Sequence, residues 1–257
     1  MRWLLEETDS TNTWLRREAT EALKRGEALA NVSAVRTRFQ SAGRGQVGNH
    51  WESEAGANLL CSIYVRDTGV PVGEQFYLSE LITLAIVSAL DLYTDGIEVK
   101  WPNDIYWHGR KLAGILIENT LAGTTIRDTI VGLGLNVYQT EFTDYPPNPT
   151  SLKLMGVKLG EDCEVQIDEL LTVITSKMYQ LLPTLEPEFY GYIKKEYFKR
   201  LYLNDGKLHD FIVTATGERW QGRLEDILPT GHLVLTGEDG ERRTFAFKEA
   251  RLIMDNG

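Results

Sequence analysis

The most apolar run of the chain, Leu81–Leu90, constrains the fold more than any other feature. Thr83 and Ser88 interrupt this run, and it is too short to cross a bilayer as a helix. It therefore predicts a long, mostly buried helix over Phe76–Tyr93. A chain of 257 residues can bury such a helix in a sizeable core, either as one large domain or as a domain with a small module.

Composition and charge narrow the class of protein. The chain is 42% hydrophobic and 25% charged, which is typical of a globular protein. Its formal charge of −10 argues against a surface that binds nucleic acid broadly, because phosphate contacts need clustered lysine and arginine. Cys61 and Cys163 lack the spacing of a zinc site, and the N-terminus lacks the apolar stretch of a signal peptide. We expect a soluble, cytoplasmic protein with no membrane partner and no metal-ligand cluster.

Hydrophobic periodicity predicts strands and helices through the first two thirds of the chain. Strands are expected at Trp3–Glu6, Ala30–Arg38, Leu59–Val65, Ile97–Trp101, Ile105–Trp107, Lys111–Glu118 and Ile126–Val137. Helices are expected between the Asp9–Asn12 cluster and Gly26, over Phe76–Tyr93 and over Ile167–Leu182, with a further helical stretch at Phe189–Tyr202.

The chain changes character after the turn signal at Asn204–Gly206. Short alternating runs separated by glycines follow, and they fit a small β-barrel. These runs are Asp210–Ala215, Glu218–Asp226, His232–Thr236 and Arg243–Phe247. We therefore expect a first domain over residues 1–185, a connecting helical segment over 186–204 and a C-terminal domain over 205–257.

A glycine-punctuated loop, Ser41–Trp51, predicts an anion site. Gly43, Gly45 and Gly48 allow several backbone amides to approach a phosphate or carboxylate, and Arg44 adds a positive charge. The same glycines match the G-x-G-x-x-G pattern of dinucleotide sites, but no helix follows the third glycine as that motif requires. The local pattern also fits a flexible surface loop, so other parts of the chain must decide.

Polar residues stand at the start of the first predicted helix. Ser10, Thr11 and Asn12 are residues that commonly cap helix N-termini, and capping is the interpretation that the local pattern favours. A helix N-terminus with spare hydroxyl and amide groups is also a good place to hold a polar ligand.

Two further segments carry polar residues beside strands. Pro102-Asn103-Asp104 has the composition of a turn and stops the strand before it. Period-two alternation places Lys111 on one face with Ala113, Ile115 and Ile117, and a lysine on an apolar face usually meets an anion or extends to solvent. Glycines inside the later strand, Gly132 and Gly134, indicate close approach of a ligand or another backbone.

Five of these blocks together resemble the biotin–protein ligases, in the order and at the spacing of that family. They are Ser10-Thr11-Asn12, Gly43-Arg44-Gly45 leading to Trp51, Lys100-Trp101-Pro102-Asn103-Asp104, Lys111–Glu118 and Gly132–Asn136. The segment after residue 204 looks like the SH3-like end domain of the family. The resemblance implies an α+β fold, with a class II synthetase-like mixed sheet flanked by helices and a small C-terminal SH3-like β-barrel.

The resemblance also implies a two-step ligase reaction. Biotin is activated by ATP to biotinyl-5′-AMP, with Mg²⁺ entering with the nucleotide, and the biotinyl group is then transferred to a lysine of a biotin carboxyl carrier protein. It implies catalytic roles for Lys111, Arg44 and Asp104. It implies biotin binding by Ser10, Thr11, Asn12, Gln40, Gly43, Arg44, Gly45, Lys111, Gly114, Gly132 and Gly134. It implies nucleotide binding by Gln46, Trp51, Asn103, Lys111 and Asn136.

Two departures from the family pattern qualify this interpretation. Many members carry a second arginine where Gln46 stands, so adenylate retention is expected to depend more on Arg44, Lys111 and loop closure. Family members that act as repressors carry a DNA-binding domain before the Ser-Thr-Asn block. Only nine residues precede Ser10, so no DNA partner is expected.

Other functions remain open at this point. A lipoate–protein ligase or octanoyl transferase shares the core fold but lacks the Lys100–Asp104 block as written here. A non-catalytic biotin or nucleotide sensor would not need Lys111, Arg44 and Asp104 together. A carrier-protein adaptor built on the C-terminal barrel explains none of the first 155 residues. An exposed sheet edge also leaves a side-by-side homodimer open.

Overall fold

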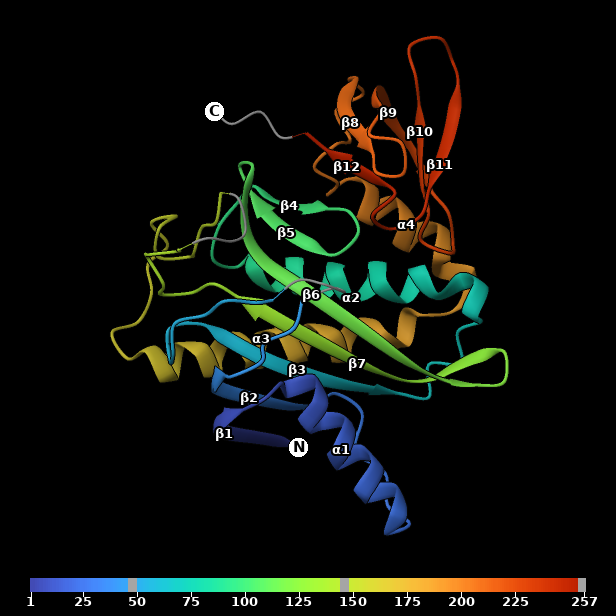
Figure 1. Ribbon diagram of the computed structural model, residues 1–257. Coiled ribbons are helices and arrows are strands. Elements are labelled where there is room, and N and C mark those ends of the chain that lie inside the picture. The colour runs from blue at the N-terminus through green and yellow to red at the C-terminus, as the bar shows by residue number, and fades with distance from the viewer. Residues whose placement is uncertain (46–49, 144–147, 254–257) are drawn as a thin grey trace.

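A computed structural model describes residues 1–45, 50–143 and 148–253 of the chain. Its centre is a seven-stranded mixed sheet in the order β1-β2-β3-β7-β6-β5-β4, in which only the β1–β2 pair is parallel (Figure 1). The strands of this sheet are β1 (Arg2–Thr8), β2 (Ser33–Gln40), β3 (Leu59–Arg66), β4 (Ile97–Lys100), β5 (Asp104–Trp107), β6 (Arg110–Ala122) and β7 (Thr125–Leu135). These bounds lie within a few residues of those predicted from periodicity.

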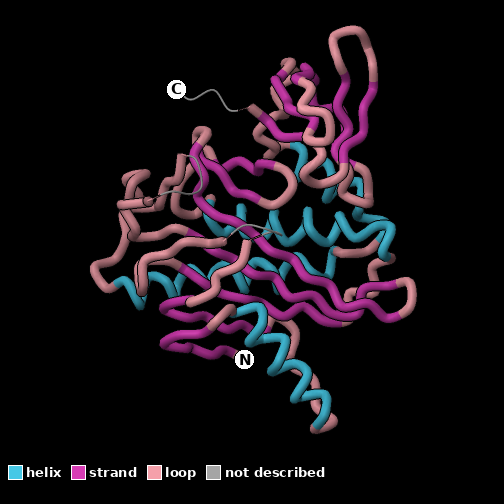
Figure 2. The backbone as a smooth tube through the Cα atoms, viewed as in Figure 1, coloured by secondary structure: helices cyan, strands magenta, loops and turns pink. Residues whose placement is uncertain are grey.

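Helices cover both faces of the sheet, as Figure 2 shows. The long apolar helix α2 (Gln75–Leu90) packs beside α3 (Cys163–Leu181) on one face. The other face is partly covered by α1 (Thr11–Lys24), which contacts β2, β3 and β7. Val35 packs in the small core under α1 and its neighbour Ala34 in the main core, as expected for residues that point to opposite faces.

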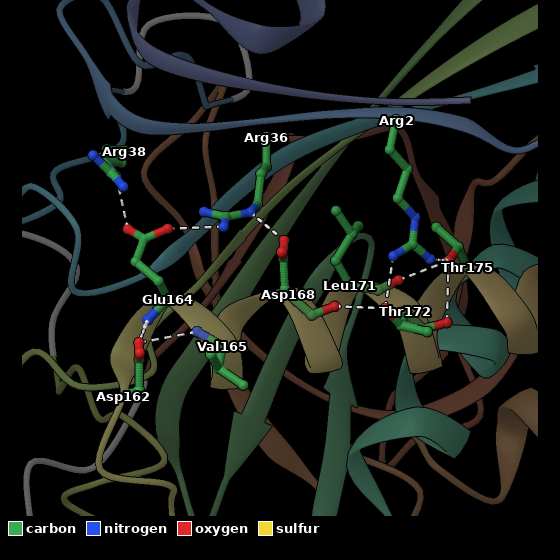
Figure 3. Close-up of polar contacts among 10 residues, drawn as sticks. All are labelled: Arg2, Arg36, Arg38, Asp162, Glu164, Val165, Asp168, Leu171, Thr172 and Thr175. Carbon is green, nitrogen blue, oxygen red and sulfur yellow. Dashed lines mark hydrogen bonds and ion pairs between the residues drawn. The ribbon is translucent and has the colours of Figure 1, made fainter.

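Arginines fasten the β1–β2 edge of the sheet to α3 (Figure 3). The buried Arg36 binds Asp168 through Nε at 2.5 Å and Glu164 through Nη2 at 2.8 Å. Arg38 donates to the other oxygen of Glu164 at 2.9 Å. Arg2 reaches the hydroxyl groups of the same helix, at Thr172 and Thr175. The helix thereby holds an edge of the sheet that its apolar face does not cover.

A second sheet forms the C-terminal part of the chain. It is antiparallel, in the order β11-β10-β9-β8-β12, and follows the short helix α4 (Tyr190–Phe198), which contacts α2. Its strands are β8 (His209–Val213), β9 (Arg219–Ile227), β10 (Leu233–Thr236), β11 (Arg242–Phe245) and β12 (Ala250–Leu252). Three short 3₁₀ turns complete the described elements, at Val72–Glu74, Leu182–Thr184 and Pro187–Phe189.

The α+β fold class is confirmed, with one correction to the shape of the C-terminal module. The sequence predicted a barrel, whereas no pairing joins β11 to β12 in the described residues, so this sheet has two edges. The last strand has three residues and pairs only with β8. A strand of that length carries no period-two signal, which is why the sequence did not indicate it. No helix in the described ranges is long and apolar enough to cross a membrane.

Candidate active site

A cavity of about 750 Å³ opens on the α1 side of the large sheet. Its walls are the start of α1, the glycine loop, the strands β5, β6 and β7, and residues of the C-terminal sheet. The volume suits a ligand of the size of a small cofactor. Most residues singled out from the sequence line this cavity: Ser10, Thr11, Asn12, Gln40, Arg44, Gly45, Trp51, Asn103, Asp104, Lys111, Gly114, Gly132 and Gly134.

A β-bulge carries Lys111 into the cavity. The β5–β6 pairing sets Asp104 opposite Gly114 and Tyr106 opposite Lys111, so Leu112 is an extra residue. Opposed residues in an antiparallel pair share a face, and therefore Lys111 lies on the face of Gly114. The prediction that Lys111 shares a face with Ala113 and its alternate neighbours was wrong, because the bulge shifts the alternation by one residue.

The lysine is held by a carboxylate in a largely buried setting. Lys111 Nζ lies 2.8 Å from Asp104 Oδ1, and the Lys111 side chain is 11% exposed. The Lys100 ammonium donates to Tyr106 Oη at 3.2 Å and lies over the same ring. Burial lowers the pKa of Lys100, while the Asp104 charge raises it and the Lys111 charge lowers it further. Two ammonium groups around one carboxylate give the cavity a positive centre in an acidic protein, which suits an anionic ligand.

Trp51 packs on Gly114 and Gly134, which together form the glycine floor of the cavity. A Cβ on Gly114 would lie 3.0 Å from Trp51 Cζ3, and a Cβ on Gly134 would overlap the indole. These glycines therefore make room for Trp51 in this structure. The indole ring lies 5.7 Å from Lys111 Nζ. Its Nε1 is buried and has no hydrogen-bond partner in the part of the chain that is described, so it is available to an acceptor on a ligand.

The polar residues at the start of α1 bind one another and the sheet. Ser10 occupies the N-cap position, but its side chain makes no capping hydrogen bond, so the capping interpretation was wrong for that hydroxyl. The backbone N–H of Thr11 donates to Gln40 Oε1 at 2.8 Å. The Ser62 hydroxyl contacts both Thr11 Oγ1, at 2.8 Å, and Asn12 Oδ1. Tertiary partners have displaced the local caps.

Gly132 makes room for this polar group. A Cβ on Gly132 would lie 2.5 Å from Asn12 Oδ1, so only glycine lets the amide rest on β7. The Asn12 amide donates to Glu118 Oε2 at 2.7 Å. A buried amide with both of its ends engaged is fixed in orientation.

Arg44 lies on the α1 side of the cavity. Its Nη2 donates to Thr13 Oγ1 at 3.0 Å and is 3.7 Å from Glu118 Oε2. The partners of Lys111 are instead Asp104 and Trp51, so the structure does not pair the two cations predicted to share one anion. The side chain of Arg44 is 45% exposed.

The remaining predicted residues of the loop have different settings. Gly43 is buried, and its carbonyl accepts from the Trp51 N–H at 3.1 Å, while Gly45 lines the cavity. Gln46 lies outside the described residues.

The two asparagines predicted to bind the nucleotide also differ in setting. Asn103 lines the cavity and holds β6, because its amide donates to the Ile115 carbonyl. Asn136 lies behind the bulge instead: its backbone N–H donates to Leu112 O and its side chain donates to Thr150 O at 2.9 Å. Asn136 Oδ1 is buried and has no partner within the described part of the chain.

Sequence reasoning missed several residues of the site. Ser62 is fully buried and was named only within the predicted strand Leu59–Val65, although a serine in a mostly apolar strand is a signal. Glu118 was quoted only as part of a block. The C-terminal sheet contributes Phe247, Lys248 and Arg251 to the cavity wall, and no local pattern predicts such long-range contacts.

Comparison with known proteins finds similar sequences. Residues 4–136 match the model of the family described as "Biotin/lipoate A/B protein ligase family". The chain is 28% identical over 243 residues to the biotin--[acetyl-CoA-carboxylase] ligase of Paracoccus denitrificans, covering 93% of this chain and 95% of that protein. It is 38% identical over 130 residues to the bifunctional ligase/repressor BirA of Escherichia coli, covering 50% of this chain and 38% of that protein.

Solved structures show the same fold. The biotin protein ligase from Aquifex aeolicus in complex with biotin and ATP superposes with a TM-score of 0.74 at 21% identity, covering 98% of each chain. The biotin protein ligase from Leishmania major in complex with biotinyl-5-AMP superposes with a TM-score of 0.63 at 23% identity, covering 96% of this chain and 98% of that one.

Proposed function

Because this chain belongs to the biotin/lipoate A/B protein ligase family, we propose that it is an ATP-dependent biotin–protein ligase. One observation carries the proposal: Lys111, held by Asp104, stands on a glycine floor in a cavity that also has a fixed polar end. The relative that matches over most of the chain bears the name of the same enzyme.

Lys111 suits the activation step. A carboxylate oxygen of biotin attacks the α-phosphorus of ATP, the bond to the bridging oxygen breaks, and pyrophosphate leaves. Two anions must come together for this attack, and a largely buried ammonium lowers their repulsion and stabilises the charge that develops on phosphate. Lys111 lines the cavity, and its ammonium group is held there by the ion pair with Asp104.

Asp104 suits the transfer step. The amine nitrogen of a carrier lysine attacks the acyl carbon of the adenylate, the anhydride C–O bond breaks, and AMP leaves as the amine gives up a proton. A carboxylate beside Lys111 can orient the incoming amine or accept its proton. The acceptor in this proposal is a biotin carboxyl carrier protein.

The fixed polar residues suit the ureido end of biotin. Gln40 Oε1 accepts from the Thr11 N–H, which leaves the Gln40 amide nitrogen to donate elsewhere, and the Ser10 hydroxyl makes no capping bond. These neutral groups complement a urea that has one acceptor and two donors. A lipoyl or octanoyl group would leave them without partners, and this favours biotin over the alternative acids.

The nucleotide is proposed to lie between Trp51, Asn103 and Lys111. Asn136 belongs to the same proposal through its buried Oδ1 behind the bulge, for which the described residues provide no partner. No group of three or more His, Cys, Asp or Glu side chains in the described ranges could hold a metal, so Mg²⁺ would enter with the phosphates and neutralise part of their charge.

The proposal also covers the domain bounds, the compartment and the pairing of two copies. The catalytic domain comprises residues 1–185, the connecting segment 186–204 and the C-terminal domain 205–257. The protein acts in the cytoplasm. It can pair side by side with a second copy through β6, because β5 covers this strand only as far as Gly114 in the described residues.

Biotin-dependent exchange of pyrophosphate into ATP tests the proposal. We expect the purified protein to catalyse exchange with biotin and MgATP, and to show no exchange when octanoate or lipoate replaces biotin. Exchange with lipoate alone would assign the chain to the lipoate branch of the family. Tight binding of biotin without any exchange would favour a sensor.

A further inference from the structure

A loop of the C-terminal sheet contacts Trp101, a residue that lines the candidate site. Residues 228–232 form a compact turn between β9 and β10, in which Gly231 N donates to Leu228 O at 2.7 Å and Leu228 N donates to His232 O at 2.9 Å. The carbonyl groups of Pro229 and Gly231 remain free to accept from outside the turn, and each is used by a different element of the large domain.

The first partner of this loop is the start of α2. The Phe76 N–H donates to Pro229 O at 3.0 Å, which satisfies one of the amide groups that a helix N-terminus leaves without an internal partner. Gly231 has φ +92, and a Cβ there would lie 2.9 Å from Phe76 Cδ2, so only glycine permits this contact. The loop is therefore fixed on a rigid helix of the main core.

The second partner is Trp101. Its Nε1 donates to Gly231 O at 3.0 Å, and its ring meets Phe247 edge-on at 6.1 Å between centroids. Trp101 follows Lys100 directly, and Lys100 pairs with Asp104 across the β4–β5 turn. Trp101 thus lies in the turn that joins the part-buried Lys100 to the carboxylate holding Lys111.

We propose that Trp101 is a positioning residue through which the C-terminal sheet fixes Lys100 and Asp104, and thereby Lys111, in the cavity. The path runs from Gly231 O to the indole N–H, along the turn to Asp104, and across 2.8 Å to Lys111 Nζ. The expected effect of Trp101 on the rate of catalysis rests on the proposed function. The geometric consequence of the inference, the place of Lys111, can be measured without catalysis.

The substitution Trp101→Phe tests the inference because it keeps an aromatic ring beside Phe247 and removes only the N–H. The loss of one hydrogen bond predicts an approximately fivefold lower kcat for pyrophosphate exchange. The KM for biotin should stay within about twofold of the wild-type value, because the polar end of the cavity lies on α1. Trp107→Phe is the matched control, since Trp107 Nε1 also donates to a backbone carbonyl, that of Asp95 at 3.1 Å.

A second measurement separates positioning from stability. Lysines are labelled by reductive ¹³C-methylation, and the Lys111 signal is assigned by its loss in Lys111→Arg. We expect Trp101→Phe to move this signal and Trp107→Phe to leave it in place. An unmoved signal together with unchanged kcat in Trp101→Phe would overturn the inference. Absence of exchange in the wild type would instead count against the proposed function, and the signal would still decide the positioning role.

Discussion

At the scale of single residues, the site depends on groups whose partners come from distant parts of the chain. Lys111 is held by Asp104, and the Asn12 amide is held by Ser62 and Glu118. The resemblance to the biotin–protein ligases selected Lys111 and Asp104 as candidates, whereas local pattern alone read Asp104 as part of a turn. The partners of Ser10–Asn12 were not predictable, because the same residues satisfy a local cap and a tertiary contact equally well.

Replacing Lys111 by alanine removes the ammonium that offsets repulsion between carboxylate and phosphate. We expect a loss of at least about 100-fold in pyrophosphate exchange, since charge stabilisation in a buried site is a large part of such catalysis. Lys153→Ala makes the same charge change at an exposed position and should leave exchange unchanged. Exchange by Lys111→Ala within a few-fold of the wild-type rate would show that another group carries the charge.

Replacing Ser62 by alanine leaves Asn12 Oδ1 without its donor. An unpaired buried acceptor costs about 1–3 kcal/mol, so we expect the KM for biotin to rise about tenfold with little change in kcat. Ser33→Ala is the matched control, because that buried hydroxyl donates to the backbone carbonyl of Ala30, at 2.7 Å. Equal effects of the two substitutions on KM would remove Ser62 from the site.

At the scale of elements, most strands and helices follow from periodicity, and the main exceptions are local breaks in it. The extra residue at Leu112 turns Lys111 onto the cavity face, and nothing in the residues around it announces a bulge. The strand was predicted correctly, but the direction of its most important side chain was not. The joints between elements are likewise made by individual polar contacts that periodicity does not show.

Arg36 joins the sheet to α3 through two ion pairs. Its side chain is 4% exposed and binds two carboxylates, so Arg36→Ala should lower the free energy of unfolding by about 2 kcal/mol. Arg66→Ala breaks an exposed pair with Asp67 and should cost less than about 0.5 kcal/mol. Chemical denaturation of both variants measures the difference, and comparable losses would contradict the assignment.

Glu80 on α2 introduces a pH dependence. Burial raises the pKa of this carboxyl from 4.5 to about 8, with Asp226 adding to the shift and Lys194 opposing it. Between these two values the folded state holds a proton that the unfolded state has lost. Stability should therefore fall as pH rises from about 5 to 8, by at most about 1.4 kcal/mol per pH unit.

The substitution Glu80→Gln removes this titration. We expect urea denaturation to show a flatter pH dependence for the variant than for the wild type, and a gain in relative stability toward pH 8. Parallel pH profiles for the two proteins would mean that Glu80 ionises normally in the fold.

At the scale of the whole molecule, an acidic chain concentrates cations in one cavity that both sheets enclose. The family and the fold were predictable, because the five blocks that carry them follow one another in the order and at the spacing of the family. The contribution of the C-terminal sheet to the cavity was not predictable. The wall residues Phe247, Lys248 and Arg251 come from the far end of the chain, and the 228–232 turn binds the large domain through backbone carbonyls, which residue type does not reveal.

The most direct test of the central claim is the mass of a purified biotin carboxyl carrier domain after incubation with this protein, MgATP and biotin. We expect one biotinyl increment, which disappears when the acceptor lysine of the carrier is replaced and when Lys111→Ala replaces the wild-type protein. An unchanged carrier mass would contradict the claim, provided that a known ligase modifies the same carrier preparation.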